Sequence, residues 1–174
     1  MTPIINLENP QLSDAPALFA QIEADREHLS QWLPWAATTR TVADEAAFLQ
    51  YCQQRIADHK LWLATIWIAN QPAGMIDLHE FKDDHAAVGY WLASSLRGQG
   101  IMTRCLAAAE QIGFTTLDLH VINLLAAPEN KASRAVAMHR HFHQDGILRD
   151  YLPTSDGGYQ DAVIYSKLAD EFEA

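Results

Sequence analysis

The spacing of apolar residues changes along the chain, and the changes mark off its expected helices and strands. Helical spacing over Asp14–Arg26 and Thr41–His59 predicts two helices, with a short aromatic-rich element, His28–Trp35, between them. That element is expected to stop at Pro34. Runs rich in β-branched and aromatic residues follow, separated by short turns, and predict a meander of three antiparallel strands. These strands are Leu61–Ala69, Ala73–Phe81 and Ala86–Leu92.

In the second half of the chain, helical spacing of apolar residues alternates with strand-like runs, and the chain ends in a predicted hairpin. Asn130 is a suitable N-cap for the second of its two helices. The whole order predicts an α+β fold with a mixed sheet, mostly antiparallel, and a crossover helix near the middle. The expected elements are a helix at Ile101–Phe114, a strand at Leu117–Ala126, a helix at Asn130–Phe142, and strands at Gly146–Tyr151 and Tyr159–Lys167.

Composition and charge narrow the classes of function. The 174 residues contain no linker or repeat, which predicts a single domain over residues 1–174. Twelve basic residues against 22 acidic ones give a net charge of −10, so nucleic acid is not an expected partner. Cys52 and Cys105 form neither a disulfide framework nor a metal motif. We read neither a signal peptide nor an apolar run of membrane-helix length, so we expect a cytoplasmic protein without a membrane partner.

A glycine loop stands between the third predicted strand and the helix that follows it. It runs from Arg97 to Thr103 as Arg-Gly-Gln-Gly-Ile-Met-Thr. Free backbone N–H groups and the positive end of a helix dipole form an anion site at such a junction, and Arg97 adds a cationic donor. A Walker loop is excluded because no Gly-Lys-Ser/Thr triplet occurs. A dinucleotide fold, the pyrophosphate of coenzyme A and a plain tight turn are the remaining readings, and a meander upstream disfavours the dinucleotide fold.

This loop resembles the Arg/Gln-x-x-Gly-x-Gly/Ala loop of the GNAT superfamily of acyl-CoA N-acyltransferases. Other segments follow one another in the order that the family has, and they are similar to those of its RimJ/RimL subgroup of ribosomal-protein N-terminal acetyltransferases. The chain departs from the family pattern at Ala87, where an acidic residue is frequent, and at His141, where a glycine is usual. The matching segments are His28–Trp35, Val88–Leu92, Glu129–Ser133, Val136–Met138, Phe142 and Asp145–Arg149.

The resemblance implies the GNAT fold, a mostly antiparallel central sheet with a parallel pair of strands splayed at the acetyl-CoA site and helices on both faces. It implies acetyl-CoA as the acetyl donor, no metal, and a primary amine as the acceptor. It implies that the backbone of Gly89–Leu92 holds the pantetheine arm and that Asn130 and Ser133 lie near the pantetheine and the thiol. A homodimer, frequent in the family, is left open. The residues that the resemblance assigns to acetyl-CoA are Tyr90, Trp91, Leu92, Arg97, Gly98, Gln99, Gly100, Ile101, Met102, Thr103 and Asn130.

Acetyl transfer to an amine requires a free amine, donors for the carbonyl oxygen and a proton for the leaving thiolate. For the oxygen we expect a backbone N–H near Tyr90 or Trp91, and for the thiolate the hydroxyl of Ser133. Asp77 and His79 share one face of a predicted strand, and an imidazole titrates in the suitable range for a base. A structural role for His79, or a water relay without a single base, remains an alternative.

The sequence leaves the acceptor open. A protein N-terminal α-amino group, as on a ribosomal protein, is the expectation from the subgroup; a polyamine or antibiotic amine is the second candidate. A non-catalytic acyl-CoA sensor is the rival from another class, favoured by Ala87. His139 and His143 would lie one turn apart if the helix continued, which permits a zinc site, although no further ligand is near in sequence.

Overall fold

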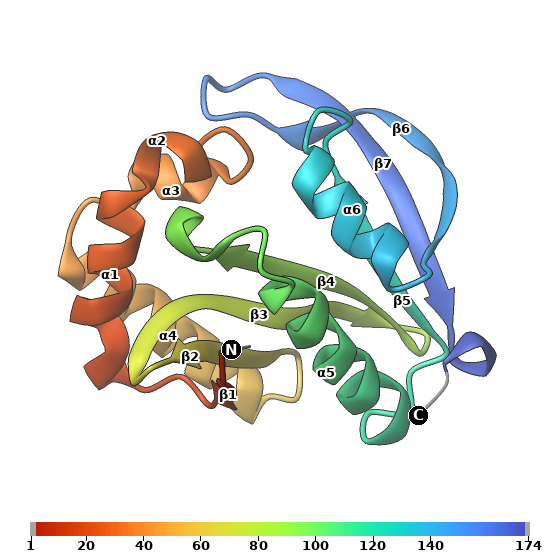
Figure 1. Cartoon of the computed structure of the whole chain (residues 1–174), viewed down its shortest axis with the longest axis horizontal. Helices are drawn as coiled ribbons and strands as arrows, with labels where there is room; N and C mark the ends of the chain where they lie inside the picture. Colours follow the sequence, from red (N-terminus) through yellow and green to blue (C-terminus); the bar gives the residue numbers. More distant parts are fainter. Residues whose placement is uncertain (1–2, 173–174) are drawn as a thin grey trace.

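The computed structural model describes residues 3–172, which form a seven-stranded mixed sheet with helices on both faces (Figure 1). The strands lie in the order β1-β2-β3-β4-β5-β7-β6, and only β4 and β5 are parallel neighbours. The strands are β1 (Ile5–Glu8), β2 (Trp62–Ile68), β3 (Gln71–Lys82), β4 (His85–Leu92), β5 (Val121–Ala126), β6 (His143–Pro153) and β7 (Tyr159–Leu168). The helices are α1 (Ala15–Ala24), α2 (Arg26–Leu29), α3 (Pro34–Thr38), α4 (Val42–Ala57), α5 (Ile101–Thr115) and α6 (Lys131–His139).

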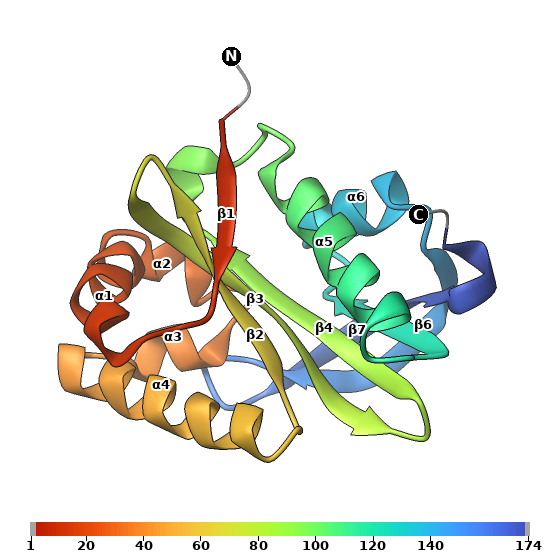
Figure 2. The same cartoon turned by 90° about the horizontal axis from the view of Figure 1, so that it is seen from below.

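The two faces of the sheet carry separate apolar cores. Helices α1 to α4 cover one face, and α5 and α6 lie on the other (Figure 2). Because side chains alternate along a strand, Leu63 of β2 and Met75 of β3 pack toward α1 to α4, while Ile66 and Ile76 pack toward α5. The central strands are therefore buried on both sides, which explains their nearly continuous apolar sequence.

A buried group of three charges ties the second layer of helices to the sheet. Glu110 of α5 is fully buried and accepts two hydrogen bonds of 2.8 Å from Arg140, just after α6. Lys167 of β7 donates to the same carboxylate at 2.8 Å and to the carbonyl of Arg140 at 2.9 Å. A buried carboxylate needs such partners, so these contacts fix the end of α6 against α5 and β7.

The predicted α+β class and the mixed, mostly antiparallel sheet are confirmed, but the first helical segments differ from expectation. The helix predicted over Asp14–Arg26 breaks at Asp25, whose backbone is not helical (φ −122°, ψ 13°). Pro34 begins α3 instead of ending a helix, because its missing N–H does no harm in a first turn and it holds Leu33 extended. Strand β1 was not predicted, since four residues are too short to give a clear period.

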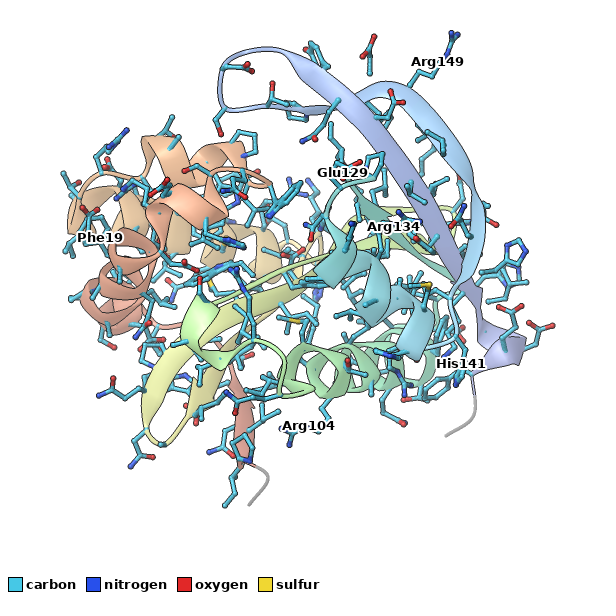
Figure 3. The ribbon with its side chains drawn as sticks, turned by 45° about the horizontal axis from the view of Figure 1, so that its top comes forward. Phe19, Arg104, Glu129, Arg134, His141 and Arg149 are labelled. Atoms are coloured by element: carbon cyan, nitrogen blue, oxygen red, sulfur yellow. The ribbon has the colours of Figure 1, made fainter. Side chains whose placement is uncertain are left out.

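The helix predicted over Asn130–Phe142 also ends earlier than expected. Asn130 is its N-cap, as predicted, but α6 stops at His139 and His141 has a left-handed φ of 60°. His141 therefore lies past the end of α6 (Figure 3), and His143 belongs to β6. The helical spacing that the zinc alternative needed does not exist. Among residues 3–172 no group of three or more His, Cys, Asp or Glu side chains is placed to hold a metal ion.

Candidate active site

Strands β4 and β5 part from each other in the middle of the sheet. Their ladder runs from His85 and Val121 to Val88 and Leu124. Beyond it, β4 continues along β3 as far as Leu92, and β5 continues along β7. The backbone of β4 from Gly89 onward has thus left β5. We call this opening the fork; it offers strand backbone groups to a ligand in extended conformation.

The glycine loop leads from the open end of β4 to the start of α5. Gly100 is the N-cap of α5 with φ 69°, a left-handed conformation that favours glycine, and a Cβ on it would meet no atom within 4 Å. The first amides of a helix have no partner within the helix, so those that follow Gly100 point to the open space before α5. The local geometry agrees with the predicted anion site.

Arg97 of this loop has protein partners. Its Nη2 donates to the carbonyl of Leu92 at 2.9 Å and to Oδ2 of Asp25 at 3.1 Å. Asp25 also accepts from the backbone N–H of Ser94 at 3.0 Å and from its hydroxyl. Burial lowers the pKa of Arg97, and the charge of Asp25 opposes this. The contacts join the loop to the break between α1 and α2, a link that sequence reasoning missed because Asp25 and Arg97 are 72 residues apart.

One side of the fork carries Tyr90, Ser133 and Asn130. The Tyr90 hydroxyl is 2.9 Å from Oγ of Ser133, in the first turn of α6. The N–H of Ser133 donates to Oδ1 of Asn130 at 3.1 Å, which caps the helix. Burial raises the pKa of Tyr90 to about 12, and the hydrogen bond with Ser133 acts in the opposite direction. The structure therefore brings together three residues that were predicted at the coenzyme site.

The other side of the fork carries Asp77 and His79 of β3. Asp77 lies opposite Gly89 in the ladder and His79 lies opposite Ala87. A Cβ on Gly89 would come within 3.0 Å of Oδ2 of Asp77, so the missing side chain leaves the carboxylate uncovered at the root of the fork. Nδ1 of His79 is 2.5 Å from Oδ1 of Asp77. The predicted common face of the two residues is confirmed.

The electrostatics of this pair favour a protonatable imidazole. Burial acts to lower the pKa of His79, but the hydrogen bond and charge of Asp77 outweigh it and raise the pKa above the ordinary 6.5. The charge of Glu80 adds to the increase, and that of Arg55 opposes it. Because Tyr90 follows Gly89 in an extended strand, its side chain points to the opposite face of the sheet. The fork thus lies between a His–Asp pair and a Tyr–Ser pair.

Aromatic side chains and a hairpin border the His–Asp side. Trp35 of α3 packs edge-on against Trp91 of β4, with ring centroids 6.1 Å apart. The turn between β6 and β7 reaches the loop after α2 (Figure 1), where the hydroxyl of Ser155 donates to the carbonyl of Ser30. These contacts place α3 and the β6–β7 turn on the face of the sheet that carries Asp77 and His79.

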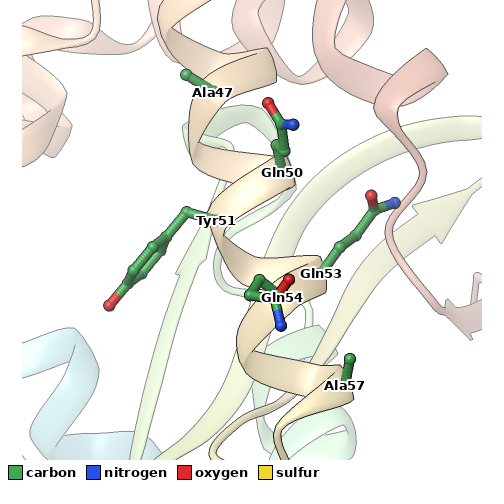
Figure 4. A pocket seen from close by; sticks show the side chains of 6 residues that line it. All are labelled: Ala47, Gln50, Tyr51, Gln53, Gln54 and Ala57. Atoms are coloured by element: carbon green, nitrogen blue, oxygen red, sulfur yellow. The ribbon is translucent and has the colours of Figure 1, made fainter.

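Two surface hollows lie elsewhere and carry no comparable chemistry. The larger, about 550 Å³, is a shallow depression on one face of α4 only (Figure 4), lined by Ala47, Gln50, Tyr51, Gln53, Gln54 and Ala57. The other lies beside His85, at the end of β4 away from the fork.

Within residues 3–172, no helix is both long and apolar enough to span a membrane.

The mixed sheet, open between β4 and β5 and with a glycine loop at the start of α5, has the fold of solved acetyltransferase structures. The chain belongs to the GNAT acetyltransferases: residues 5–143 match the family described as "Acetyltransferase (GNAT) domain". This assignment confirms the resemblance to the GNAT superfamily that the Arg97–Thr103 loop carries.

Individual relatives agree with this assignment. The chain is 29% identical to the "Putative ribosomal N-acetyltransferase YdaF" of Bacillus subtilis (strain 168), over 92% of this chain and 88% of the relative. It is similar to Mycobacterium smegmatis RimJ in complex with CoA-disulfide, with a TM-score of 0.92, 28% identity, and 99% and 86% of the two chains covered. It is also similar to RimL, a ribosomal L7/L12 alpha-N-protein acetyltransferase in complex with coenzyme A, with a TM-score of 0.89, 26% identity, and 97% and 96% covered.

Proposed function

We propose that this protein transfers the acetyl group of acetyl-CoA to the α-amino group of a protein N-terminus, with a ribosomal protein as the substrate. The observation that carries the proposal is the fork with one His–Asp pair and one Tyr–Ser pair on its two sides. The names of RimJ, RimL and YdaF support the substrate class. A net charge of −10 suits a cationic amine as the partner.

The residues around the fork fit acetyl-CoA. Gly98 and Gly100 both have left-handed φ angles and open space at the Cβ position, so the loop lets a pyrophosphate approach its amides closely. The backbone of Tyr90, Trp91 and Leu92 would hold the pantetheine as an added strand holds its neighbour. The remaining residues that we assign to the coenzyme are Arg97, Gln99, Ile101, Met102, Thr103 and Asn130.

The protein's own groups would supply two proton transfers. Acetyl-CoA, when bound, supplies an acetyl group activated as a thioester. His79, oriented by Asp77, takes a proton from the acceptor amine as the new C–N bond forms. A backbone N–H of Tyr90 or Trp91 donates to the carbonyl oxygen, where negative charge develops. As the C–S bond breaks and its electron pair goes to sulfur, Ser133 gives its hydroxyl proton and regains one from solvent.

The position of His79 bears on the missing acid of the family pattern. Position 87, where that acid is frequent, holds alanine, and His79 is its direct partner across the β3–β4 ladder. The imidazole of His79, on the neighbouring strand β3, therefore takes the role of base that the acid at position 87 has in the family pattern. This favours an enzyme over the alternative of a non-catalytic acyl-CoA sensor, which the replacement by Ala87 otherwise supports.

Binding and turnover together test the proposal. Acetyl-CoA at ~100 times its Kd should stabilise the fold by about 2.7 kcal/mol in thermal unfolding, whereas NADH should not. At pH 7, His79→Gln should lower kcat/KM by about 10²-fold or more while the Kd for acetyl-CoA stays within about twofold. His85→Gln, beside the β3–β4 turn, is the matched control and should be near normal. Acetyl-CoA binding without thiol release for any amine would favour the sensor.

A further inference from the structure

Ser133 would need a defined direction for its hydroxyl proton, and Tyr90 is the residue that contacts this hydroxyl. The two oxygens are 2.9 Å apart on one side of the fork, although the residues are 43 positions apart in sequence. The backbone N–H of Ser133 already bonds Asn130, so the capping of α6 does not use the hydroxyl. Among the described residues, Tyr90 is the only hydrogen-bond partner recorded for Oγ of Ser133.

A packing role alone does not explain the phenol oxygen. The ring of Tyr90 packs against the apolar core on the α5 side, and phenylalanine would fill the same volume. A buried hydroxyl without a partner costs free energy, so the oxygen is placed where Ser133 can meet it. A second oxygen of Ser133, its carbonyl, is 3.4 Å away. The phenol therefore aims at the first turn of α6 and at one residue of it.

We propose that Tyr90 is a positioning residue that donates to Oγ of Ser133 and so directs the Ser133 proton toward the departing sulfur. This inference rests on the proposed function of Ser133. A hydroxyl has one donor and two acceptor sites, so a bond accepted from Tyr90 leaves the Ser133 proton free for the fork. Donation from Tyr90 also polarises Ser133, which makes it a better donor in turn. The pKa of Tyr90, raised to about 12 by burial, keeps the phenol protonated at working pH.

The test compares variants with a matched control under saturating amine. Tyr90→Phe keeps the ring and removes the oxygen; kcat should fall about 10-fold, the effect of one lost hydrogen bond, and KM for acetyl-CoA should stay within about twofold. Ser133→Ala should lower kcat by roughly 10²-fold. The double variant should match Ser133→Ala alone, because Tyr90 acts only through Ser133. Rates are measured well below the melting temperature of each variant.

Tyr165→Phe is the control for loss of a buried phenol beside α6. Its oxygen accepts from Nε of Arg134 at 2.9 Å, and the variant should keep kcat within about twofold. If Ser133→Ala lowers kcat but Tyr90→Phe does not, the positioning role is overturned and the role of Ser133 stands. If Tyr90→Phe has the same effect with and without Ser133, Tyr90 acts by another route and the inference is overturned. If Ser133→Ala itself keeps normal kcat, both roles fail.

Discussion

His79 faces Ala87 directly across the β3–β4 ladder, and Asp77 holds its imidazole through Nδ1. In the proposed reaction the neutral imidazole is the base, so the rate should fall when His79 becomes protonated. Asp77 raises the pKa of His79 above 6.5, against the effect of burial. The acid limb of the profile of kcat/KM against pH should therefore lie above pH 6.5 in the parent protein.

Asp77→Asn should move that limb to lower pH. Without the carboxylate charge, burial dominates and lowers the pKa of His79. The stability effect has a definite sign as well: the attraction of Asp77 for protonated His79 is present below pH 6.5 and is lost as pH rises through the raised pKa. The variant should thus be destabilised most at low pH. An unmoved limb would mean that His79 is not the titrating base.

Gly100→Val tests the anion site at the start of α5. A β-branched residue at φ 69° is strained by about 1–2 kcal/mol, and the loop would no longer approach a pyrophosphate closely. The Kd for acetyl-CoA should rise at least about 10-fold in calorimetric titration. Gly157→Val is the matched control, because Gly157 also has a left-handed φ (86°) and open space but lies in the β6–β7 turn. Equal Kd values for the two variants would mean that the Arg97–Thr103 loop is a plain turn and does not bind the pyrophosphate.

The sequence predicted the parts of the site that depend on local pattern. Strand alternation was enough to place Asp77 and His79 on one face, and the glycine loop identified the start of α5. The fork was expected only from the resemblance, which implies a splayed parallel pair; the local pattern does not give it, because it depends on where the pairing of β4 with β5 ends, a property of register and not of either strand alone. The contacts of Tyr90 with Ser133 and of Arg97 with Asp25 join distant segments, so no local signal precedes them.

Glu110→Gln should be strongly destabilising. The change leaves Lys167, only 4% exposed, and the partly buried guanidinium of Arg140 without their counter-charge. Removing one partner of a buried ion pair costs about 3–5 kcal/mol. Urea unfolding should show this loss in the free energy of unfolding, whereas Glu8→Gln at an exposed position should change it by less than about 0.5 kcal/mol. A loss below about 1 kcal/mol would show that the three charges contribute little.

Glu45→Gln should stabilise the protein at neutral and higher pH. Glu45 of α4 is 2% exposed, its Oε1 has no partner among the described residues, and burial raises its pKa from 4.5 to about 7. In the unfolded chain the Glu45 carboxyl ionises above pH 4.5, whereas in the folded protein it ionises only at about pH 7. The free energy of unfolding therefore falls between these two pH values, by about 3 kcal/mol. Glu45→Gln should remove this decline, and Glu27→Gln at an exposed site should keep it. A decline unchanged in Glu45→Gln would exclude Glu45 as its source.

The site of acetylation on a peptide tests the central claim most directly. Two peptides are compared by mass spectrometry after incubation with acetyl-CoA: one has a free N-terminal serine and no lysine, and the other has a blocked N-terminus and one lysine. We expect an acetyl group on the α-amine of the first peptide, none on the second, and a loss of about 10²-fold in rate with Ser133→Ala. An unmodified first peptide, with acetyl transfer to polyamines or aminoglycosides in parallel reactions, would contradict the proposed function.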